Sequence, residues 1–327
     1  MKKLVSISLV AAISSPFINA QNQNEQVRNR IEGTERPSAN KQVSQVSDKS
    51  KASSESPSDT GAQRPVILKK KGFSAFFGYD TKYFYRSNPL AQEGKLKQQA
   101  TGMWTNTFYG GSGLGVYDMT DYVLTPYVGG SWTLNDYVES GLETFNYNST
   151  GAYALLLAQF SSGWSCRAGV SYSNDRSTEF DTEDFKEFYP NLGIMKAYNI
   201  SDNLSSVFDA SIGRHNAETF SLGIAGTSEK ELSNTEIAAS YALTYNWESL
   251  ILIPKYKISY KDYDKGINNG RTDTTHDLSL RADYLLGESL KLSAFYSYSN
   301  RNAKDAQLPS DYESYDAGVG LGINARF

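Results

Sequence analysis

The chain has 327 residues, a formal net charge of −4 and a mean hydropathy of −0.49, and 13% of its residues are aromatic. The negative charge argues against nucleic acid as a partner, because nucleic-acid-binding surfaces are strongly basic. The low hydropathy argues against a helical membrane protein, because each spanning helix needs about 20 mostly apolar residues. A transmembrane β-barrel remains compatible with it, because apolar and polar residues alternate along each of its strands.

The N-terminus has the layout of an export signal. Lys2 and Lys3 form a positive start, residues 4–13 are mostly apolar, and a small residue, Ala20, follows shortly after. This arrangement is typical of a secretory signal peptide. We therefore expect residues 1–20 to be a signal peptide that is cleaved after Ala20, in a cell of the Gram-negative type.

The next segment is polar. Residues 21–65 contain no aromatic residue, and their few apolar residues are isolated among Gln, Asn, Ser, Lys and Glu. Such a segment cannot bury enough apolar surface to offset the entropy of ordering its backbone. We expect residues 21–70 to be a disordered periplasmic tail, with a tether to the cell wall or to a partner as the alternative.

From residue 72 onward the hydropathy alternates with a period of two. The last strand shows it best, because Tyr315, Val319 and Ile323 fall on one face and glycines and polar residues fall on the other. A period of two is that of a β-strand with an apolar outside and a polar inside. The aromatic Phe327 at the end of this strand resembles the C-terminal assembly signal of outer-membrane barrels.

Short and long connections alternate along this region. The expected short turns are 118–121, 161–163, 201–203, 247–249 and 287–289, and the expected long loops are 86–101, 135–148, 174–186, 215–232, 262–272 and 300–311. Short periplasmic turns and long outer loops are typical of outer-membrane barrels. The sequence therefore predicts an all-β fold, a transmembrane antiparallel up-and-down β-barrel of about 12 strands over residues 71–327, with ten or fourteen strands as alternatives.

Tyrosine and tryptophan lie near the expected strand ends. The set near short turns is Trp164, Tyr245 and Trp247, and the set toward the long loops is Tyr83, Tyr172, Tyr260 and Tyr296. These rings suit the membrane interface, because they are apolar with one polar group. By the same alternation, Cys166 points to lipid, and as the single cysteine it cannot form an intrachain disulfide.

The first strand reads Thr81-Lys82-Tyr83-Phe84-Tyr85-Arg86. This stretch resembles the opening strand of the TorF-type putative porins, which carries a Ser/Asp-x-Tyr-x-Phe-Arg-Gly pattern. Ser87 stands where that family has glycine. The resemblance implies an outer-membrane porin of unknown substrate.

Enzyme chemistry has little support in the sequence. An outer-membrane phospholipase would need a serine two residues after a histidine, and neither His215 nor His276 has one. A protease of the outer membrane would need paired acidic groups beside a histidine, and Asp181, Glu183 and Asp184 are interpreted more simply as part of a solvated loop. We expect no enzymatic activity, no catalytic residues, no cofactor and no metal site.

Charged residues on the polar faces predict the lining of a pore. The basic candidates lie nearer the short turns, where Asp283 partly neutralises them, and the other acidic candidates lie nearer mid-strand or the outer mouth. The predicted pore-lining residues are Lys255, Lys257, Arg281, Asp283, Lys291, Arg326, Asp80, Asp209 and Glu236. A wet lumen with these basic residues favours anions weakly, whereas pairing of the charges across the lumen would plug it.

These features predict a porin-like channel for passive diffusion of small polar solutes. A structural or surface-interaction barrel without a conducting pore is the alternative, followed by an autotransporter-type translocator. The expected partners are outer-membrane lipid, the barrel-assembly machinery and small polar solutes. The expected location is the outer membrane, with the N-terminal tail in the periplasm.

Overall fold

The computed structural model describes residues 74–89, 100–219, 230–287, 289–306 and 311–326. The strands are β1 (Ser74–Arg86), β2 (Thr101–Gly113), β3 (Tyr117–Asp118), β4 (Tyr122–Tyr137), β5 (Tyr147–Phe160), β6 (Trp164–Ser177), β7 (Glu183–Ser201), β8 (Leu204–Thr219), β9 (Asn234–Trp247), β10 (Leu250–Tyr263), β11 (Thr272–Leu285), β12 (Leu290–Lys304) and β13 (Tyr312–Arg326). The helices in these described residues are two short 3-10 helices, η2 (Glu143–Phe145) and η3 (Gly266–Asn268). Within the described ranges, no helix combines the length and the apolar character needed to cross a membrane.

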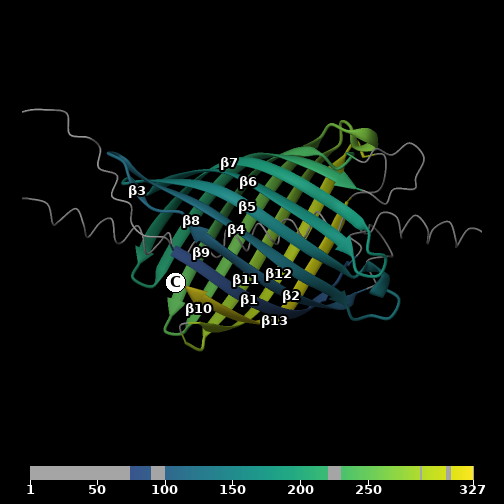
Figure 1. The fold of residues 1–327 in the computed structure, drawn as a ribbon, viewed down its shortest axis with the longest axis horizontal. Coiled ribbons are helices and arrows are strands. Elements are labelled where there is room, and N and C mark those ends of the chain that lie inside the picture. Colours follow the sequence, from purple (N-terminus) through teal and green to yellow (C-terminus); the bar gives the residue numbers. More distant parts are fainter. Residues whose placement is uncertain (1–73, 90–99, 220–229, 288, 307–310, 327) are drawn as a thin grey trace, which may run out of the picture.

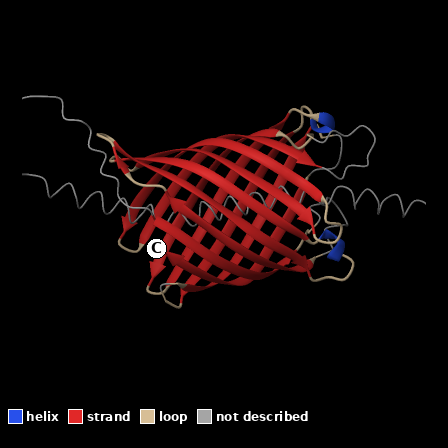
Figure 2. Cartoon of the chain, in the orientation of Figure 1, coloured by secondary structure: helices blue, strands red, loops and turns tan. Residues whose placement is uncertain are grey.

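The strands form one closed antiparallel barrel (Figures 1 and 2). Each long strand pairs with its neighbours in the sequence, and β1 pairs with β13 from Phe76↔Arg326 to Arg86↔Asp316, which closes the ring. The short β3 lies outside this ring and pairs only with β4. Closure leaves the twelve long strands without a free edge, as a barrel in lipid requires. The predicted up-and-down barrel of about 12 strands is confirmed.

The turns and loops fall close to their expected positions, with two differences. Several strands run further toward the long loops than expected, as β8 does by reaching Thr219, because its pairing with β7 continues to Phe185↔Thr219. The second strand ends at Gly113 instead of continuing to residue 118. Tyr117 and Asp118 instead pair with Leu124 and Val123 of β4, which adds a small hairpin at the short-turn end.

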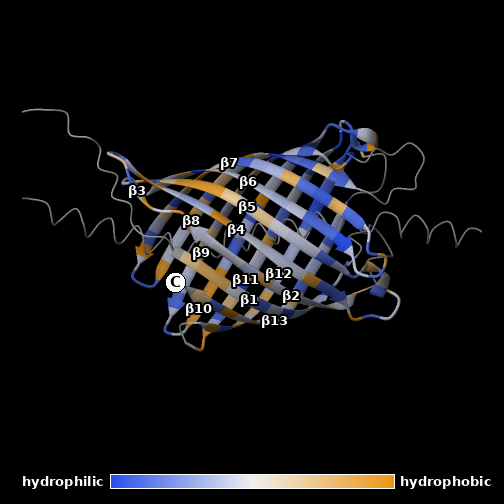
Figure 3. Ribbon diagram, in the orientation of Figure 1, coloured by the Kyte–Doolittle hydropathy of each residue, from blue (hydrophilic) through white to orange (hydrophobic). Residues whose placement is uncertain are grey.

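The outer face of the barrel is apolar and aromatic. Side chains such as Leu192, Val319 and Ile237 are more than half exposed, and the tyrosines and tryptophans expected at the strand ends also point outward. Figure 3 shows hydrophobic residues interleaved with hydrophilic ones along the strands, and more hydrophilic strand ends beside the 3-10 helices. A continuous apolar surface of this kind suits lipid and not water. Cys166 is exposed on this face, as predicted.

Several predictions from the sequence fall on residues outside the described ranges. These are the signal peptide at residues 1–20, the whole 21–70 tail, and the assembly signal Phe327. The described chain begins in β1 and ends in β13 at the short-turn end of the barrel (Figure 1).

Candidate functional site: the barrel lumen

One side of the lumen wall is uncharged. The strands β2 and β5 contain no charged residue, and Asp136, the charged residue of β4, alternates with the buried Asn135 and Tyr137 and so lies on the outer side. The inward residues of these three strands are mostly threonine, serine, tyrosine and glycine. They offer hydroxyl groups to a solute without attracting ions of either sign.

Three tyrosines on the inner face lie over glycines of neighbouring strands. A Cβ atom added to Gly78 would lie 2.2 Å from Cζ of Tyr109, and one added to Gly129 would lie 2.5 Å from Cε1 of Tyr153. Tyr189 covers Gly213 in the same way. Because the glycines have no side chain, these rings can rest against the wall. This arrangement keeps them out of the centre of the lumen.

The opposite side of the wall carries a chain of charged residues across four strands. His215 Nδ1 lies 2.7 Å from Oε1 of Glu187, and its Nε2 lies 2.9 Å from Oε2 of Glu236. Lys257 Nζ lies 3.2 Å from Oε1 of Glu236. The ring of Tyr189 stacks on His215 at 4.0 Å between ring centroids. All four charged or titratable groups are buried, so their mutual pairing offsets the cost of removing them from water.

Other ion pairs strengthen the same wall. Arg167 of β6 extends over Gly193 of β7 and reaches Asp209 of β8, with 2.9 Å between Nη1 and Oδ2. Arg281 and Asp283 of β11 approach to 3.1 Å. The Arg167–Asp209 pair joins β6 to β8 across β7, so it opposes sliding of these strands, whereas the Arg281–Asp283 pair lies within one strand.

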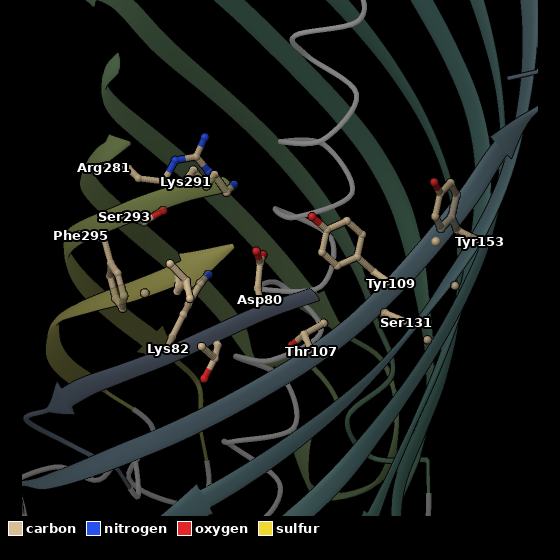
Figure 4. A pocket seen from close by; sticks show the side chains of 16 residues that line it. Asp80, Lys82, Thr107, Tyr109, Ser131, Tyr153, Arg281, Lys291, Ser293 and Phe295 are labelled. Atoms are coloured by element: carbon tan, nitrogen blue, oxygen red, sulfur yellow. The ribbon is translucent and has the colours of Figure 1, made fainter. Parts of the chain in front are cut away.

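A cavity of about 110 Å³ lies in the lumen between the uncharged side and the charged side of the wall (Figure 4). Asp80 and Lys82 of β1, Arg281 of β11 and Lys291 of β12 line its charged side. Tyr109 and other residues of β2, β4 and β5 line its uncharged side. Three cations and one carboxylate line this space, and Asp283 lies 3.1 Å from one of these cations, Arg281, so one net positive charge remains.

The predicted pore-lining residues have several different environments. Asp80, Arg281 and Lys291 line the cavity, and Asp283 lies behind Arg281. Lys257, Glu236 and Asp209 are held in the ion pairs of the wall, and Lys255 is half-buried on the inner face. The backbone at Arg326 pairs with Phe76, and its side chain lies outside the described part. Among the described residues, no group of His, Cys, Asp and Glu is placed to hold a metal ion.

Sequence reasoning missed Lys82 and the role of His215. Lys82 lies two positions from Asp80 on the same face of β1, so the alternation that selected Asp80 could also have selected it. The carboxylate partners of His215 come from β7 and β9. These are not the acidic residues 181–184 that the protease reading considered, and no alternation within one strand reveals such partners.

An ion pair joins the wall to an outer loop. Arg214 Nη2 lies 2.7 Å from Oδ1 of Asp264 and 2.8 Å from its Oδ2. The hydrogen bonds from Arg214 lower the pKa of Asp264 below its ordinary value. Both side chains are partly exposed, so water screens this pair and its contribution to stability is small.

No protein-family model matches this sequence, and no curated protein does either. Among solved structures, an outer membrane channel from Pseudomonas putida F1 matches with a TM-score of 0.50 and 9% identity, over 81% of this chain and all of that one. The β domain of the autotransporter BrkA from Bordetella matches with a TM-score of 0.44 and 11% identity, over 76% of this chain and 99% of that one. An anion-selective porin from Comamonas acidovorans matches with a TM-score of 0.40 and 8% identity, over 78% of this chain and 99% of that one. The similarity to the Pseudomonas channel supports the barrel fold alone. The chain therefore has the fold of an outer-membrane β-barrel.

Proposed function

We propose that this chain is a porin-like channel of the outer membrane, through which small polar solutes diffuse passively. An apolar exterior and a polar interior suit a barrel embedded in lipid with water inside. The N-terminal tail then lies in the periplasm, because an even number of spanning strands returns both ends to the short-turn side. The partial match of residues 81–86 to the TorF-type putative porins is consistent with this function, and membership of that family stays a prediction.

The placement of the inward tyrosines that lie over glycines is the observation that carries this proposal. Tyr109 and Tyr153 rest over Gly78 and Gly129 instead of projecting across the lumen. A barrel of this size is small enough to be filled by its own side chains if they project inward. Flattening the rings against the wall leaves space for water and solute beside the hydroxyl-lined side.

The cavity makes anions the preferred ions of this channel. Lys82 and Lys291 face the space together with Asp80, the one acidic lining residue among those described, and Arg281 lines it while it pairs with Asp283 at 3.1 Å. Basic groups around a constriction raise the local concentration of anions. Lys257 contributes less than its sequence position suggests, because Glu236 neutralises it at 3.2 Å.

Single-channel recording in planar bilayers tests this function. The full chain should form steady conducting channels, and the reversal potential under a KCl gradient should show weak preference for chloride. Lys291→Glu should shift the reversal potential toward cation preference, and raising the salt should reduce the shift by screening. A clear cation preference in the wild type would refute the selectivity, and folded barrels without conductance would refute the channel.

A structural barrel without a conducting pore is the second candidate. Two groups of paired side chains favour a barrel without a pore, because their inward charges neutralise one another. One is the buried row of ion pairs that begins at Glu187 and ends at Lys257, and the other is the Arg167–Asp209 pair. Absence of conductance from correctly folded protein would support this candidate. An autotransporter-type translocator would need its passenger in residues that lie before β1, and these lie outside the described ranges.

A further inference from the structure

We infer that the lumen cavity is a binding site for small zwitterionic solutes, molecules of the amino-acid class that carry a carboxylate and an ammonium group together. The inference rests on the proposed function and names the kind of solute that the channel favours. It is drawn from three features of the cavity: a floor of glycines, a buried carboxylate without a partner, and a group of cations beside it.

The floor of the cavity is the inner face of β13. Three successive inward positions of β13 are Gly318, Gly320 and Gly322, of which Gly320 lines the cavity, and each lies between one residue of β1 and one of β12 in the strand register. The three rows are Phe84–Gly318–Phe295, Lys82–Gly320–Ser293 and Asp80–Gly322–Lys291. Because β13 adds no side chain here, the side chains of its two neighbours can lie over it and face the same space.

Asp80 is the residue that would bind the ammonium group of the solute. Its side chain is buried, with 9% exposure, and its Oδ1 has no hydrogen-bond partner. Leaving a buried carboxylate oxygen unsatisfied is costly, and the cost is larger for a charged group than for a neutral one. Figure 4 shows Asp80 directed into the cavity between Lys82 and Tyr109. A donor supplied by a bound solute would satisfy this oxygen.

The cationic side chains beside Asp80 would bind the carboxylate group of the solute. Lys82 crosses Gly320 so that its Nζ lies 5.7 Å from the ring centroid of Phe295. Arg281 is paired in register with Phe295 from the other side, and Lys291 follows two rows further along β12. Amino and guanidinium groups that converge in this way are the usual partners of a carboxylate.

The position of Asp80 relative to Lys291 explains why one solute should carry both charges. A point at the Cβ position of Gly322 lies 2.5 Å from Oδ1 of Asp80 and 2.7 Å from Cε of Lys291. Even so, among the described residues the two side chains do not form an ion pair. The ammonium of an amino acid would pair with Asp80 while its carboxylate pairs with the neighbouring cations. A hydroxyl group would satisfy Asp80 less well, because charge-assisted hydrogen bonds are about twice as strong as neutral ones.

Ligand-observed saturation-transfer NMR on the folded full chain in detergent micelles tests the inference. The probes are L-alanine, propionate, which lacks the ammonium, and lactamide, which lacks both charges. We expect alanine to bind at least about tenfold more tightly than lactamide, since a hydrogen bond to a charged group is worth about 1.5 kcal/mol or more. Propionate should bind with intermediate affinity, because the cations hold it and Asp80 does not.

Two variants separate the roles of the charges. Asp80→Asn should lower the affinity for alanine to that for propionate without weakening propionate, and Lys291→Met should weaken both. Lys304→Met, on the same strand but exposed near its outer end, is the control and should change neither affinity. Each variant should retain the heat-modifiable mobility of a folded barrel on gels.

The outcomes of these experiments distinguish the binding site from the channel. Equal binding of alanine and propionate to wild type, or the same loss for both in Asp80→Asn, would overturn the inference. A wild type that conducts ions without preferring alanine would overturn it while leaving the channel intact. A wild type that binds alanine as expected but never conducts would support the site and refute the channel.

Discussion

Adding a single methyl group at Gly78 should narrow the lumen. In Gly78→Ala the new Cβ would lie 2.2 Å from Cζ of Tyr109, whereas ordinary contact begins at 3.4 Å. The distance between the new Cβ and the Tyr109 ring must therefore increase by the difference, 1.2 Å. The ring has to move away from the wall, because the backbone at Gly78 is paired with β2 on one side and β13 on the other. The far end of a tyrosine is flexible, so we expect a loss of stability of about 1 kcal/mol, at the low end for overpacked sites.

Gly102→Ala is the matched control for this experiment. Its new Cβ would lie 2.6 Å from the hydroxyl oxygen of Tyr83, again the end of a tyrosine, but on the outer face of the barrel. Both variants should fold with similar heat-modifiability on gels, and only Gly78→Ala should lower the single-channel conductance in planar bilayers. Equal conductance in Gly78→Ala and wild type, with the barrel folded, would refute the view that flattened tyrosines keep the lumen open.

Further predictions concern the outer face, an outer loop and a buried ion pair. A membrane-impermeant maleimide should label Cys166 poorly in intact membranes and well after denaturation, because this side chain faces lipid; fast labelling of the native protein would contradict its placement. The Arg214–Asp264 pair should stabilise the barrel above the ordinary pKa of aspartate and lose this effect as the pH falls through the lowered pKa, a change of at most about 1 kcal/mol that Asp264→Asn should remove in acid-denaturation curves. Arg86→Met should cost about 3–5 kcal/mol in urea unfolding, because it leaves Asp316 without the partner that now lies 2.9 Å away. Adding Asp316→Leu should recover much of that loss, and no recovery would argue against the pair.

The strands and the direction of their side chains could be predicted from the sequence. Lipid and lumen select opposite polarity at successive positions, so the alternation reports which residues face outward. This is why the predicted outward positions of Cys166, Tyr172 and Val319 agree with the structure. The strand limits near the long loops were predicted less well, because backbone pairing continues past the point where lipid selects the side chains.

The pairing of the inward charges was decided by the tertiary structure. Sliding a strand by two residues preserves its alternation but changes every neighbour across the barrel, so the alternation alone could not show that Lys257 meets Glu236. Nor could it show that Arg167 reaches Asp209 by crossing Gly193. The sequence by itself thus determined a barrel with a polar interior, because polarity is selected position by position. The register of its strands decided which charges neutralise each other and which, around Asp80 and Lys291, are left facing the lumen.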